Sequence, residues 1–381
     1  MRSDMSEKPN EPLKFKPHLK DKLWGGKRLG RMYRVEDTQR RIGEAWLIED
    51  TVTVSSGDCA GLTLSEIVSR DPAGILGTLG QAAGCEESPS GGSAICRFPL
   101  LIKLLDASDV LSVQVHPDDA YARERERQPF GKCEVWYVLE AEPGAQIIHG
   151  FKHPMSRDEL RQAIAQGRLA DALETVQVKP GDVVLNTPGT VHALGAGMLV
   201  YELQQFSDLT YRLYDWDRLE NGRPRALHID QSIEVADLAP FERHTIEPVV
   251  LSDAGVRRAC FAATRHFAGE ILTIVSASAQ QTTGASFHAL TALRGEGSIV
   301  YGEGRLMPLV AGESVVVPAS LGSYQIVAAS RPFVVARAYV PDLMEDIARP
   351  LLARGVAAET IAQLGGDGDR SDLRRLLAAG S

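Results

Sequence analysis

Leu111-Ser112-Val113-Gln114-Val115-His116-Pro117-Asp118-Asp119 is the most informative stretch of this sequence. Its alternation of apolar and polar side chains predicts a β-strand, and His-Pro-Asp-Asp is typical of the turn that ends one. Successive strand side chains point to opposite faces, so Ser112, Gln114 and His116 share one face and the two valines share the other. A polar face with a wholly apolar reverse side is unusual for a strand that simply faces solvent.

The strand that precedes it is almost entirely apolar. Residues 98–105 read Phe-Pro-Leu-Leu-Ile-Lys-Leu-Leu, with Lys103 as the single charged residue. Such a strand belongs in a core, because apolar side chains dominate both of its faces. We therefore expect Lys103 to point into a wet or charged interior space.

Two later segments also place polar groups on predicted strands. In residues 131–139 (Gly-Lys-Cys-Glu-Val-Trp-Tyr-Val-Leu), alternation puts Lys132, Glu134 and the tryptophan on one face. In residues 179–193, a Pro-Gly-Asp turn leads into a short apolar strand, and a Thr-Pro-Gly-Thr turn leaves His192 on the strand's rim.

Four of these side chains together indicate a metal site. Gln114, His116, Glu134 and His192 offer two nitrogens and two oxygens, a set suited to a divalent metal, of which Zn2+ is the commonest candidate. A single histidine or glutamate on a strand is far more often a surface or hydrogen-bonded residue than a ligand. The joint pattern is what favours the metal site.

The same pattern resembles the metal motifs of the cupin barrels. Residues 181–192 read Gly-x5-(Pro/Thr)-x-Gly-x2-His, which is similar to the second cupin motif. Gln-x-His, followed by a glutamate on the next strand, resembles the first motif. Most cupins have His-x-His there, and the glutamine at position 114 points to one particular family.

Four segments carry the resemblance to that family, the type I phosphomannose isomerases in their compact bacterial form. They read Val-Gln-Val-His-Pro-Asp-Asp, Gly-Lys-Cys-Glu-Val-Trp-Tyr-Val-Leu, Pro-Gly-Thr-Val-His-Ala and Gln-Gln-Phe-Ser-Asp-Leu-Thr-Tyr-Arg-Leu-Tyr-Asp. The resemblance covers residues 12–340 and is most specific in residues 98–218. It implies zinc ligands at Gln114, His116, Glu134 and His192.

The resemblance also implies a reaction, the interconversion of mannose 6-phosphate and fructose 6-phosphate through a cis-enediol. Arg212 matches the family's proposed catalytic arginine and would face the enediolate charge. Glu202 and Lys132 lie on ligand-bearing faces and are the candidates to move the proton. For the phosphate we expect Ser112 and Lys103, which are predicted to face the interior.

Three other functions fit part of the pattern. The same fold could isomerise another phosphorylated aldose, which only a panel of substrates would distinguish. A metal-dependent oxygenase cupin would prefer a histidine-rich Fe(II) site, against which Gln114 and Lys132 argue. A non-catalytic sugar-phosphate-binding cupin would be expected to lack a ligand, and none is missing from the motifs.

Composition agrees with a small-molecule enzyme. The chain has 381 residues, is 44% hydrophobic and has a formal charge of −9, which argues against a nucleic-acid partner. No window is apolar and long enough to span a membrane, and the polar start lacks the apolar segment of a secretory signal. Five scattered cysteines without a Cys-x-x-Cys pair predict a cytoplasmic protein with no disulfide framework.

The order of motifs predicts a mainly β protein with two cupin (jelly-roll) barrels. We expect a flexible tail at 1–11, a catalytic barrel at 12–240 and a metal-free barrel at 241–340, followed by a helical extension at 341–381. The second barrel is indicated by Gly312-Glu313-Ser314-Val315-Val316-Val317-Pro318, a fainter copy in which Ser323 holds the position of His192. His288 is predicted to be structural, and no chemistry is legible in the extension.

Helical signals are confined to a few places. Thr63 is predicted to cap a short helix that Asp71-Pro72 interrupts, and residues 83–95 are predicted to be a loop. Ser156, with Glu159 three residues later, predicts the start of a helical insertion at about 156–175. The sequence does not indicate an oligomeric state.

Overall fold

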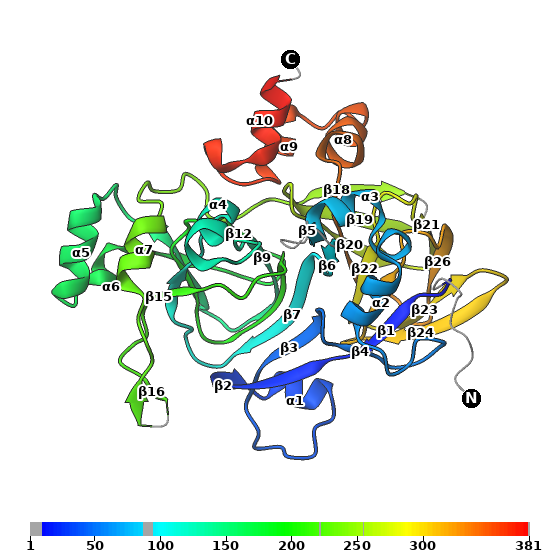
Figure 1. Ribbon diagram of the computed structural model, residues 1–381, viewed down its shortest axis with the longest axis horizontal. Helices are drawn as coiled ribbons and strands as arrows, with labels where there is room; N and C mark the ends of the chain where they lie inside the picture. The colour runs from blue at the N-terminus through cyan, green and yellow to red at the C-terminus, as the bar shows by residue number, and fades with distance from the viewer. Residues whose placement is uncertain (1–9, 87–93, 221, 254, 380–381) are drawn as a thin grey trace. The chain divides into compact units, whose positions relative to one another are not determined.

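The computed structural model describes residues 10–86, 94–220, 222–253 and 255–379, and the chain in this part is mainly β (Figure 1). It divides into two compact units built from interleaved segments. The first unit contains the chain up to His18, Trp46–Leu101 and Pro248–Ile361, and the second contains Leu19–Ala45, Ile102–Glu247 and Ala362–Ser381. The division into consecutive domains at 12–240, 241–340 and 341–381 stays a prediction.

The second unit is built mainly on two sheets and carries all of the predicted site residues. The five-stranded sheet has the order β11-β10-β13-β8-β15, and the six-stranded sheet has the order β12-β9-β14-β7-β2-β3. The strands of the first sheet are β8 (Val113–Val115), β10 (Gln146–Phe151), β11 (Leu173–Gln177), β13 (His192–Leu194) and β15 (Tyr211–Tyr214). Those of the second are β2 (His18–Gly26), β3 (Ile42–Ile48), β7 (Leu100–Ala107), β9 (Glu134–Ala141), β12 (Val183–Asn186) and β14 (Met198–Gln205).

Apolar side chains cover the outer face of the five-stranded sheet. Val113 and Val115 are fully buried in a cluster that also contains Leu160, Leu169 and Ile233. These partners come from the helices α5 (Arg157–Ala165), α6 (Leu169–Ala172) and α7 (Ile229–Val235), which lie on the side of β15 in Figure 1. Within the helical insertion predicted at about 156–175, the structure has α5 and α6 up to Ala172, after which β11 begins.

The inner faces of the two sheets pack against each other. Trp136, Val138 and Val200 of the six-stranded sheet share one buried cluster with Ile147 and Leu194 of the five-stranded sheet. The polar residues that alternate with apolar ones on β8, β9 and β14 therefore point into an interior and not into bulk solvent. The remaining elements of this unit are α1 (Arg28–Met32), α4 (Asp119–Tyr121), the π-turn η1 (Ala122–Glu126), β16 (Leu219–Glu220), β17 (Arg223–Pro224), η3 (Gly368–Arg370) and α10 (Asp372–Ala379).

The first unit is built on an eight-stranded and a four-stranded sheet, whose inner faces share one apolar cluster. The larger sheet contains β1 (Leu13–Lys16), β4 (Thr53–Val54), β18 (Val249–Asp253), β19 (Val256–Ala263), β20 (Ala268–Ile274), β22 (His288–Arg294), β25 (Ser314–Val317) and β27 (Phe333–Tyr339). The smaller contains β21 (Ala277–Gln281), β23 (Glu296–Tyr301), β24 (Arg305–Val310) and β26 (Ser323–Ala328). Helices α2 (Leu64–Arg70), η2 (Leu343–Ala348) and α8 (Arg349–Ala353) belong to it, and α9 (Ala358–Gln363) spans its last residue. Of the predicted flexible tail, residues 1–9 lie outside the described residues, whereas Glu11 is buried.

Both predicted helix caps are confirmed. The Thr63 side chain accepts a hydrogen bond from the Glu66 amide, and the Ser156 side chain accepts one from the Glu159 amide. In each case the glutamate bonds back to the capping residue, which completes a capping box and satisfies two backbone donors. The helix starts were therefore readable from four-residue patterns alone.

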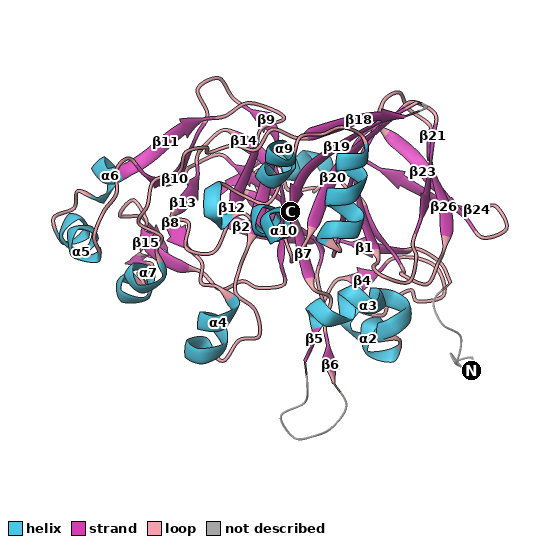
Figure 2. Cartoon of the chain, turned by 90° about the horizontal axis from the view of Figure 1, so that it is seen from above, coloured by secondary structure: helices cyan, strands magenta, loops and turns pink. Residues whose placement is uncertain are grey.

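Of two predictions between residues 70 and 96, one is confirmed and one is wrong. Asp71-Pro72 interrupts the helix as predicted, because α2 ends at Arg70, and Asp71 then caps a new helix, α3 (Pro72–Gly84), with the proline in its first turn. Of the loop predicted at 83–95, residues 87–93 lie outside the described residues, and its two ends pair as strands β5 (Cys85–Glu86) and β6 (Ile95–Cys96), drawn beside α2 and α3 in Figure 2. Their register sets Cys85 opposite Cys96, and these two residues form a disulfide, so the prediction of no disulfide framework is also wrong.

We expect the stability of the protein to depend on pH through Asp50. This carboxylate is buried, accepts a 2.9 Å bond from the Phe98 amide, and has a pKa raised from 3.8 to about 6 because burial disfavours its charge. Its contribution is thus present below the unfolded-state value and is lost as pH rises through about 6. Asp50→Asn should therefore become more stable relative to the parent as pH rises from 4 to 8, by up to about 3 kcal/mol. Urea unfolding at both pH values measures the difference, and an equal difference at both would contradict it.

Candidate metal centre and adjoining pocket

A row of polar side chains crosses the five-stranded sheet from strand to strand. The register pairs His149 of β10 with His192 of β13, His192 with Gln114 of β8, and Gln114 with Arg212 of β15. Directly opposed residues in antiparallel strands share one face, so these four side chains line one side of the interior. The alternation of residues 111–116 predicted the face, and the sheet register supplies the neighbours.

A second row crosses the six-stranded sheet. Glu134 of β9 is opposed by Asn186 of β12 on one side and by Gln204 of β14 on the other. Two residues further along, Trp136 is opposed by Glu202. The amide of Asn186 donates a 3.2 Å hydrogen bond to Glu134 Oε1, which fixes the orientation of that carboxylate.

Three side chains from the two rows converge. The Nε2 atoms of His116 and His192 lie 3.6 and 3.1 Å from the two oxygens of Glu134, and all three ligand atoms lie within 4.8 Å of one another. Each of the three residues is at most 1% exposed. The amide nitrogen of Gln114 lies 3.3 Å from His192 Nε2, so the fourth predicted ligand adjoins the same point.

The hydrogen bonds of the two imidazole Nδ1 atoms leave the Nε2 atoms able to bind a cation. His116 Nδ1 lies 2.9 Å from the Leu209 carbonyl and His192 Nδ1 lies 2.9 Å from the Thr190 carbonyl. Because a carbonyl only accepts, Nδ1 carries the proton in both rings and both Nε2 lone pairs face the Glu134 carboxylate. His116 Nε2 is buried and has no hydrogen-bond donor in the described part of the chain. Electron pairs that face one another without a proton between them are what a divalent metal satisfies.

The protonation states agree with metal binding. Burial lowers the pKa of His116 to about 3, and the nearby Lys132 ammonium adds to that effect. Burial alone would raise the pKa of Glu134, but the Lys132 ammonium, 2.8 Å from its Oε2, together with His116 and His192 outweighs burial and holds that pKa well below its ordinary value. A neutral imidazole and an ionised carboxylate are the forms that bind a metal.

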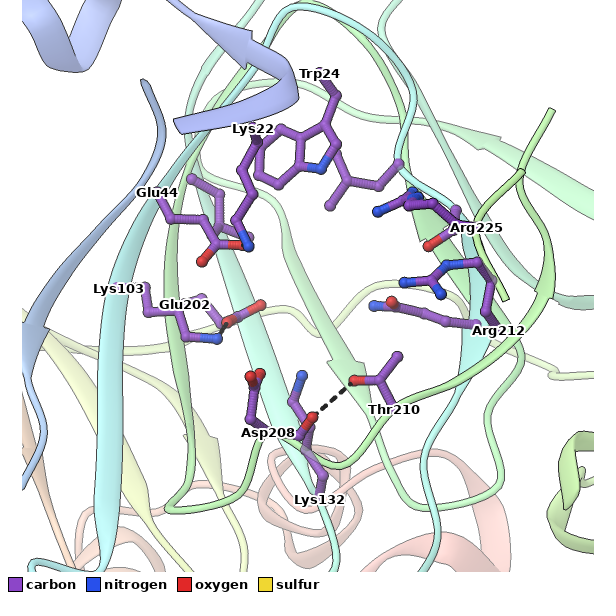
Figure 3. Close-up of a pocket in the computed structure, with 14 residues that line it drawn as sticks. Lys22, Trp24, Glu44, Lys103, Lys132, Glu202, Asp208, Thr210, Arg212 and Arg225 are labelled. Atoms are coloured by element: carbon purple, nitrogen blue, oxygen red, sulfur yellow. Dashed lines mark hydrogen bonds and ion pairs between the residues drawn. The ribbon is translucent and has the colours of Figure 1, made fainter. Parts of the chain in front are cut away.

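A cavity of about 290 Å3 adjoins this cluster in the second unit. Figure 3 shows Lys22, Glu44, Lys103 and Glu202 on one side of it and Arg212 with Arg225 on the opposite side. The lining contains five cationic side chains and three carboxylates, so it carries an excess of positive charge. Such a cavity suits a small anionic ligand.

The two arginines of the cavity have different surroundings. Arg225 is held by Asp215, with Nε–Oδ2 and Nη2–Oδ1 distances of 2.7 and 2.5 Å. Arg212 forms no ion pair with any carboxylate in the described residues, and its Nη1 donates to the Ala226 carbonyl at 2.9 Å. Burial lowers the pKa of Arg212, and the positive Arg225 adds to the effect. Of these two arginines, Arg225 is therefore neutralised by an ion pair in the described residues and Arg212 is not.

On the opposite wall a lysine and a glutamate form a buried pair. Lys103 Nζ lies 3.1 Å from Glu202 Oε1 and donates a 2.9 Å bond to Gln204. The second oxygen of Glu202 accepts a 2.9 Å bond from Trp136 Nε1. Burial raises the pKa of Glu202. Burial alone would lower the pKa of Lys103, but the combined attraction of the carboxylates around it, of which Glu202 contributes most, raises that pKa.

The structure brings every predicted site residue into one region of the second unit. Six of them line the cavity, namely Lys103, Ser112, Gln114, Lys132, Glu202 and Arg212, and the other three form the buried cluster. Sequence reasoning missed further lining residues, namely Lys22, Trp24, Glu44, Asp208, Thr210 and Arg225. Glu44 lies on β3, and its direction into the cavity is evident only in the structure, where it forms a 3.1 Å ion pair with Lys22.

The corresponding motif of the first unit contains no such group among its described residues. Ser323, at the position of His192, is exposed on β26. His288 Nδ1 lies 2.7 Å from the Tyr324 hydroxyl, which is consistent with its predicted structural role. The cluster of His116, Glu134 and His192 therefore belongs to the second unit alone.

Comparison with known proteins gives consistent results. The family model for the catalytic domain of type I phosphomannose isomerase matches residues 13–141. Mannose-6-phosphate isomerase ManA of Bacillus subtilis is 36% identical over 322 residues, which are 83% of this chain and 96% of the relative. The mannose-6-phosphate isomerase of Streptococcus mutans is 36% identical over 320 residues, covering 83% and 95% of the two chains. A crystal structure of the Bacillus subtilis mannose 6-phosphate isomerase has a TM-score of 0.75 and 31% identity and covers 86% of this chain and 99% of that one.

We expect His192→Ala and Glu134→Ala to remove the bound metal while leaving a folded protein. Each change deletes one of three convergent donors, whereas the apolar clusters around the site are unaltered. Elemental analysis of purified protein, with circular dichroism for folding, measures both effects. His153→Ala removes an exposed histidine and is the matched control. A Glu134 or His192 variant that keeps stoichiometric metal would show that the ligand assignment is wrong.

Proposed function

This chain belongs to the type I phosphomannose isomerases, and we infer from that membership and from the site geometry that it interconverts mannose 6-phosphate and fructose 6-phosphate with one Zn2+. The observation that carries the proposal is the junction of a His-Glu-His cluster with a cavity of excess positive charge. A sugar phosphate is a small anion with adjacent oxygens, and such a cavity complements both features.

We propose Gln114, His116, Glu134 and His192 as the zinc ligands. When bound, the zinc would act as a Lewis acid toward the oxygens on carbons 1 and 2 of the open-chain sugar. Asn186 would orient Glu134, and the Leu209 and Thr190 carbonyls would orient the two imidazole rings. A half-buried glutamine amide in place of the histidine of most cupins leaves the ligand set with one fewer imidazole.

The reaction requires that a proton leave carbon 2 and that a proton reach carbon 1. We propose Glu202 and Lys132 as the groups that carry it, directly or through a water, because both line the cavity beside the cluster. The raised pKa of Glu202 brings its carboxyl nearer to the range in which a group both accepts and donates protons. Removal of the proton leaves the electron pair as an enediolate, whose negative charge needs a cation nearby.

Arg212 is the cation that we propose for that charge. It stands next to Gln114 in the polar row, and no described carboxylate already neutralises it by an ion pair. For the phosphate we propose Ser112 and Lys103, which line the same cavity. The lysine is also the partner of Glu202, so phosphate binding and the proton-carrying carboxylate would be electrostatically linked.

The finer description of the fold is also proposed. Two facing sheets in each unit are what two cupin barrels would provide, the catalytic one at 12–240 and the metal-free one at 241–340, with a helical extension at 341–381. No helix in the described ranges is long and apolar enough to cross a membrane. We propose that the enzyme acts in the cytoplasm on its sugar phosphate without a nucleic-acid or membrane partner.

The function is tested directly by a coupled assay with mannose 6-phosphate on protein of measured zinc content. We expect turnover that is lost on chelation and restored by added Zn2+. A panel of other phosphorylated aldoses distinguishes the substrate, because a higher kcat/KM for one of them would replace mannose 6-phosphate in the proposal. Stoichiometric binding of sugar phosphate without turnover would favour a non-catalytic binding protein.

Arg212→Ala should lower the rate far more than it lowers zinc content. A cation that meets charge only as the enediolate forms acts on the transition state, so kcat should fall on the order of a hundredfold with a smaller change in KM. Steady-state kinetics and elemental analysis measure the two quantities. Arg125→Ala, at an arginine that is exposed, is the control. A rise in KM with kcat nearly unchanged would assign Arg212 to the phosphate instead.

The proton route predicts solvent exchange. With a side chain or water as carrier, the reaction in D2O should place deuterium on carbon 1 of the fructose 6-phosphate formed, because the carried proton exchanges with solvent. Nuclear magnetic resonance of the product measures the incorporation. Its complete absence would leave a hydride shift, or a carrier shielded from water, in place of the exchangeable base.

A further inference from the structure

The C-terminal residues contact a segment that lies behind the metal cluster. We name residues 236–246 the strap; they follow α7 and belong to the second unit with residues 362–381. Arg370 of η3 forms a 2.8 Å ion pair with Asp237 and donates a 3.2 Å bond to the Ala239 carbonyl. Its guanidinium carbon lies 4.0 Å from the centroid of the Phe241 ring.

A second residue near the C-terminus holds the same segment. The Asp367 carboxylate accepts a 2.9 Å bond from the Glu242 amide and lies 3.6 Å from Arg370 Nη1. The Arg370 side chain is 18% exposed, so this ion pair is not a fully solvated surface contact. Asp367 and Arg370 together therefore contact four residues of the strap, namely Asp237, Ala239, Phe241 and Glu242. We name Asp367 and Arg370 the clamp.

The strap in turn is bonded to the turn that carries His192. The Asp237 amide donates a 2.9 Å bond to the carbonyl of Gly189, and the Gly189 amide donates a 2.9 Å bond to the carbonyl of His116. Gly189 has a φ of +90°, in the left-handed region that favours glycine over residues with a side chain. One hydrogen-bonded path thus joins the strap to the backbone of His116 through the turn that precedes His192.

A packing path leads to the same place. The Phe241 ring lies 4.3 Å, centroid to centroid, from the ring of His149, which is 2% exposed. His149 is the direct cross-strand neighbour of His192. The ring also approaches Gly150 so closely that a Cβ there would lie 2.7 Å from Phe241. Phe241 therefore fills the space directly behind the strand pair that presents His192.

We propose that Asp367 and Arg370 are positioning residues for the metal centre, because they fix the strap and the strap fixes the orientation of His192. The proposal rests on the zinc centre of the proposed function. The described relatives match only 83% of this chain while being 95–96% covered themselves, so part of this chain has no counterpart in them. In this protein the C-terminal residues are thus part of the support of the catalytic site.

Arginine is suited to the clamp in a way that lysine is not. Its planar guanidinium can bond a carboxylate and a carbonyl at its edges while its face stacks on an aromatic ring, and Arg370 makes all three contacts. A lysine would keep the attraction to Asp237 but lose the stacked contact with Phe241. Arg370→Lys should therefore retain only part of the zinc affinity that Arg370→Ala loses.

The test is the zinc affinity of Arg370→Ala, measured in full-length protein by competition with a chromophoric chelator. Groups that orient a metal ligand typically contribute about tenfold to a hundredfold in affinity, so the dissociation constant should rise by that factor. Arg370→Lys should fall between parent and alanine variant. Arg354→Ala is the matched control, because it breaks another C-terminal arginine pair, with Asp253, that does not contact the strap.

A purely structural role is distinguished by a second measurement. Urea unfolding of the metal-free variants reports stability, and lower stability with an unaltered zinc dissociation constant would overturn the proposal. If Arg370→Ala does not fold, Phe241→Leu removes the ring behind His149 and leaves the ion pair in place, with the same expected loss of affinity. Unchanged zinc affinity in that variant overturns the proposal as well.

The result also separates this inference from the proposed function. A parent that binds zinc without isomerising mannose 6-phosphate, while Arg370→Ala binds it more weakly, refutes the function and supports the clamp. A fully active parent with variants of equal affinity refutes only the clamp. A parent that binds no zinc refutes both.

Discussion

A buried carboxylate facing two imidazole lone pairs is the constraint on which the second unit depends. Glu134 is fully buried, and its oxygens face His116 Nε2 and His192 Nε2, neither of which carries a proton. Burying a charge beside electron pairs is costly unless a cation compensates it. Lys132 supplies one positive charge at 2.8 Å, and the arrangement leaves the point between the three ligand atoms for a second. The donor set of the site thus fits a divalent cation.

The two sheets of the second unit bring these three ligand residues together through their polar inner faces. Each sheet has a polar row on its inner face, while the outer face of the five-stranded sheet is covered by three helices. A shift of one residue in the register of β8 would turn Gln114 outward and Val115 inward. The apolar cluster around Val113 and Val115 therefore fixes the metal site from the opposite face of the strand, which links core packing to ligand geometry.

Alternation and short sequence motifs predicted the strand faces and the helix caps, which depend on neighbouring residues alone. The inward faces of β8, β9 and β14 followed from alternation, and both capping boxes followed from four-residue motifs. Asp71-Pro72 predicted the end of α2 correctly, but it did not predict the helix that starts there, because a helix stop and a helix start share this dipeptide. The Cys85–Cys96 bond and the cavity-lining Arg225 depend on which distant segments meet, as does the contact of Arg370 with the strap. Periodicity carries no information on such pairings.

The first unit shows that a buried polar interior does not by itself require a metal. There Glu270 is buried on β20, but Arg337 of β27 donates to its carboxylate from Nε at 2.9 Å, so the compensating charge comes from the protein. His288 likewise has the Tyr324 hydroxyl as its partner at 2.7 Å. In the second unit the lysines stand at the edge of the cluster and the imidazole nitrogens keep their lone pairs. The difference between a structural and a catalytic interior thus lies in whether the chain supplies its own cation at the centre or leaves that position to a metal ion.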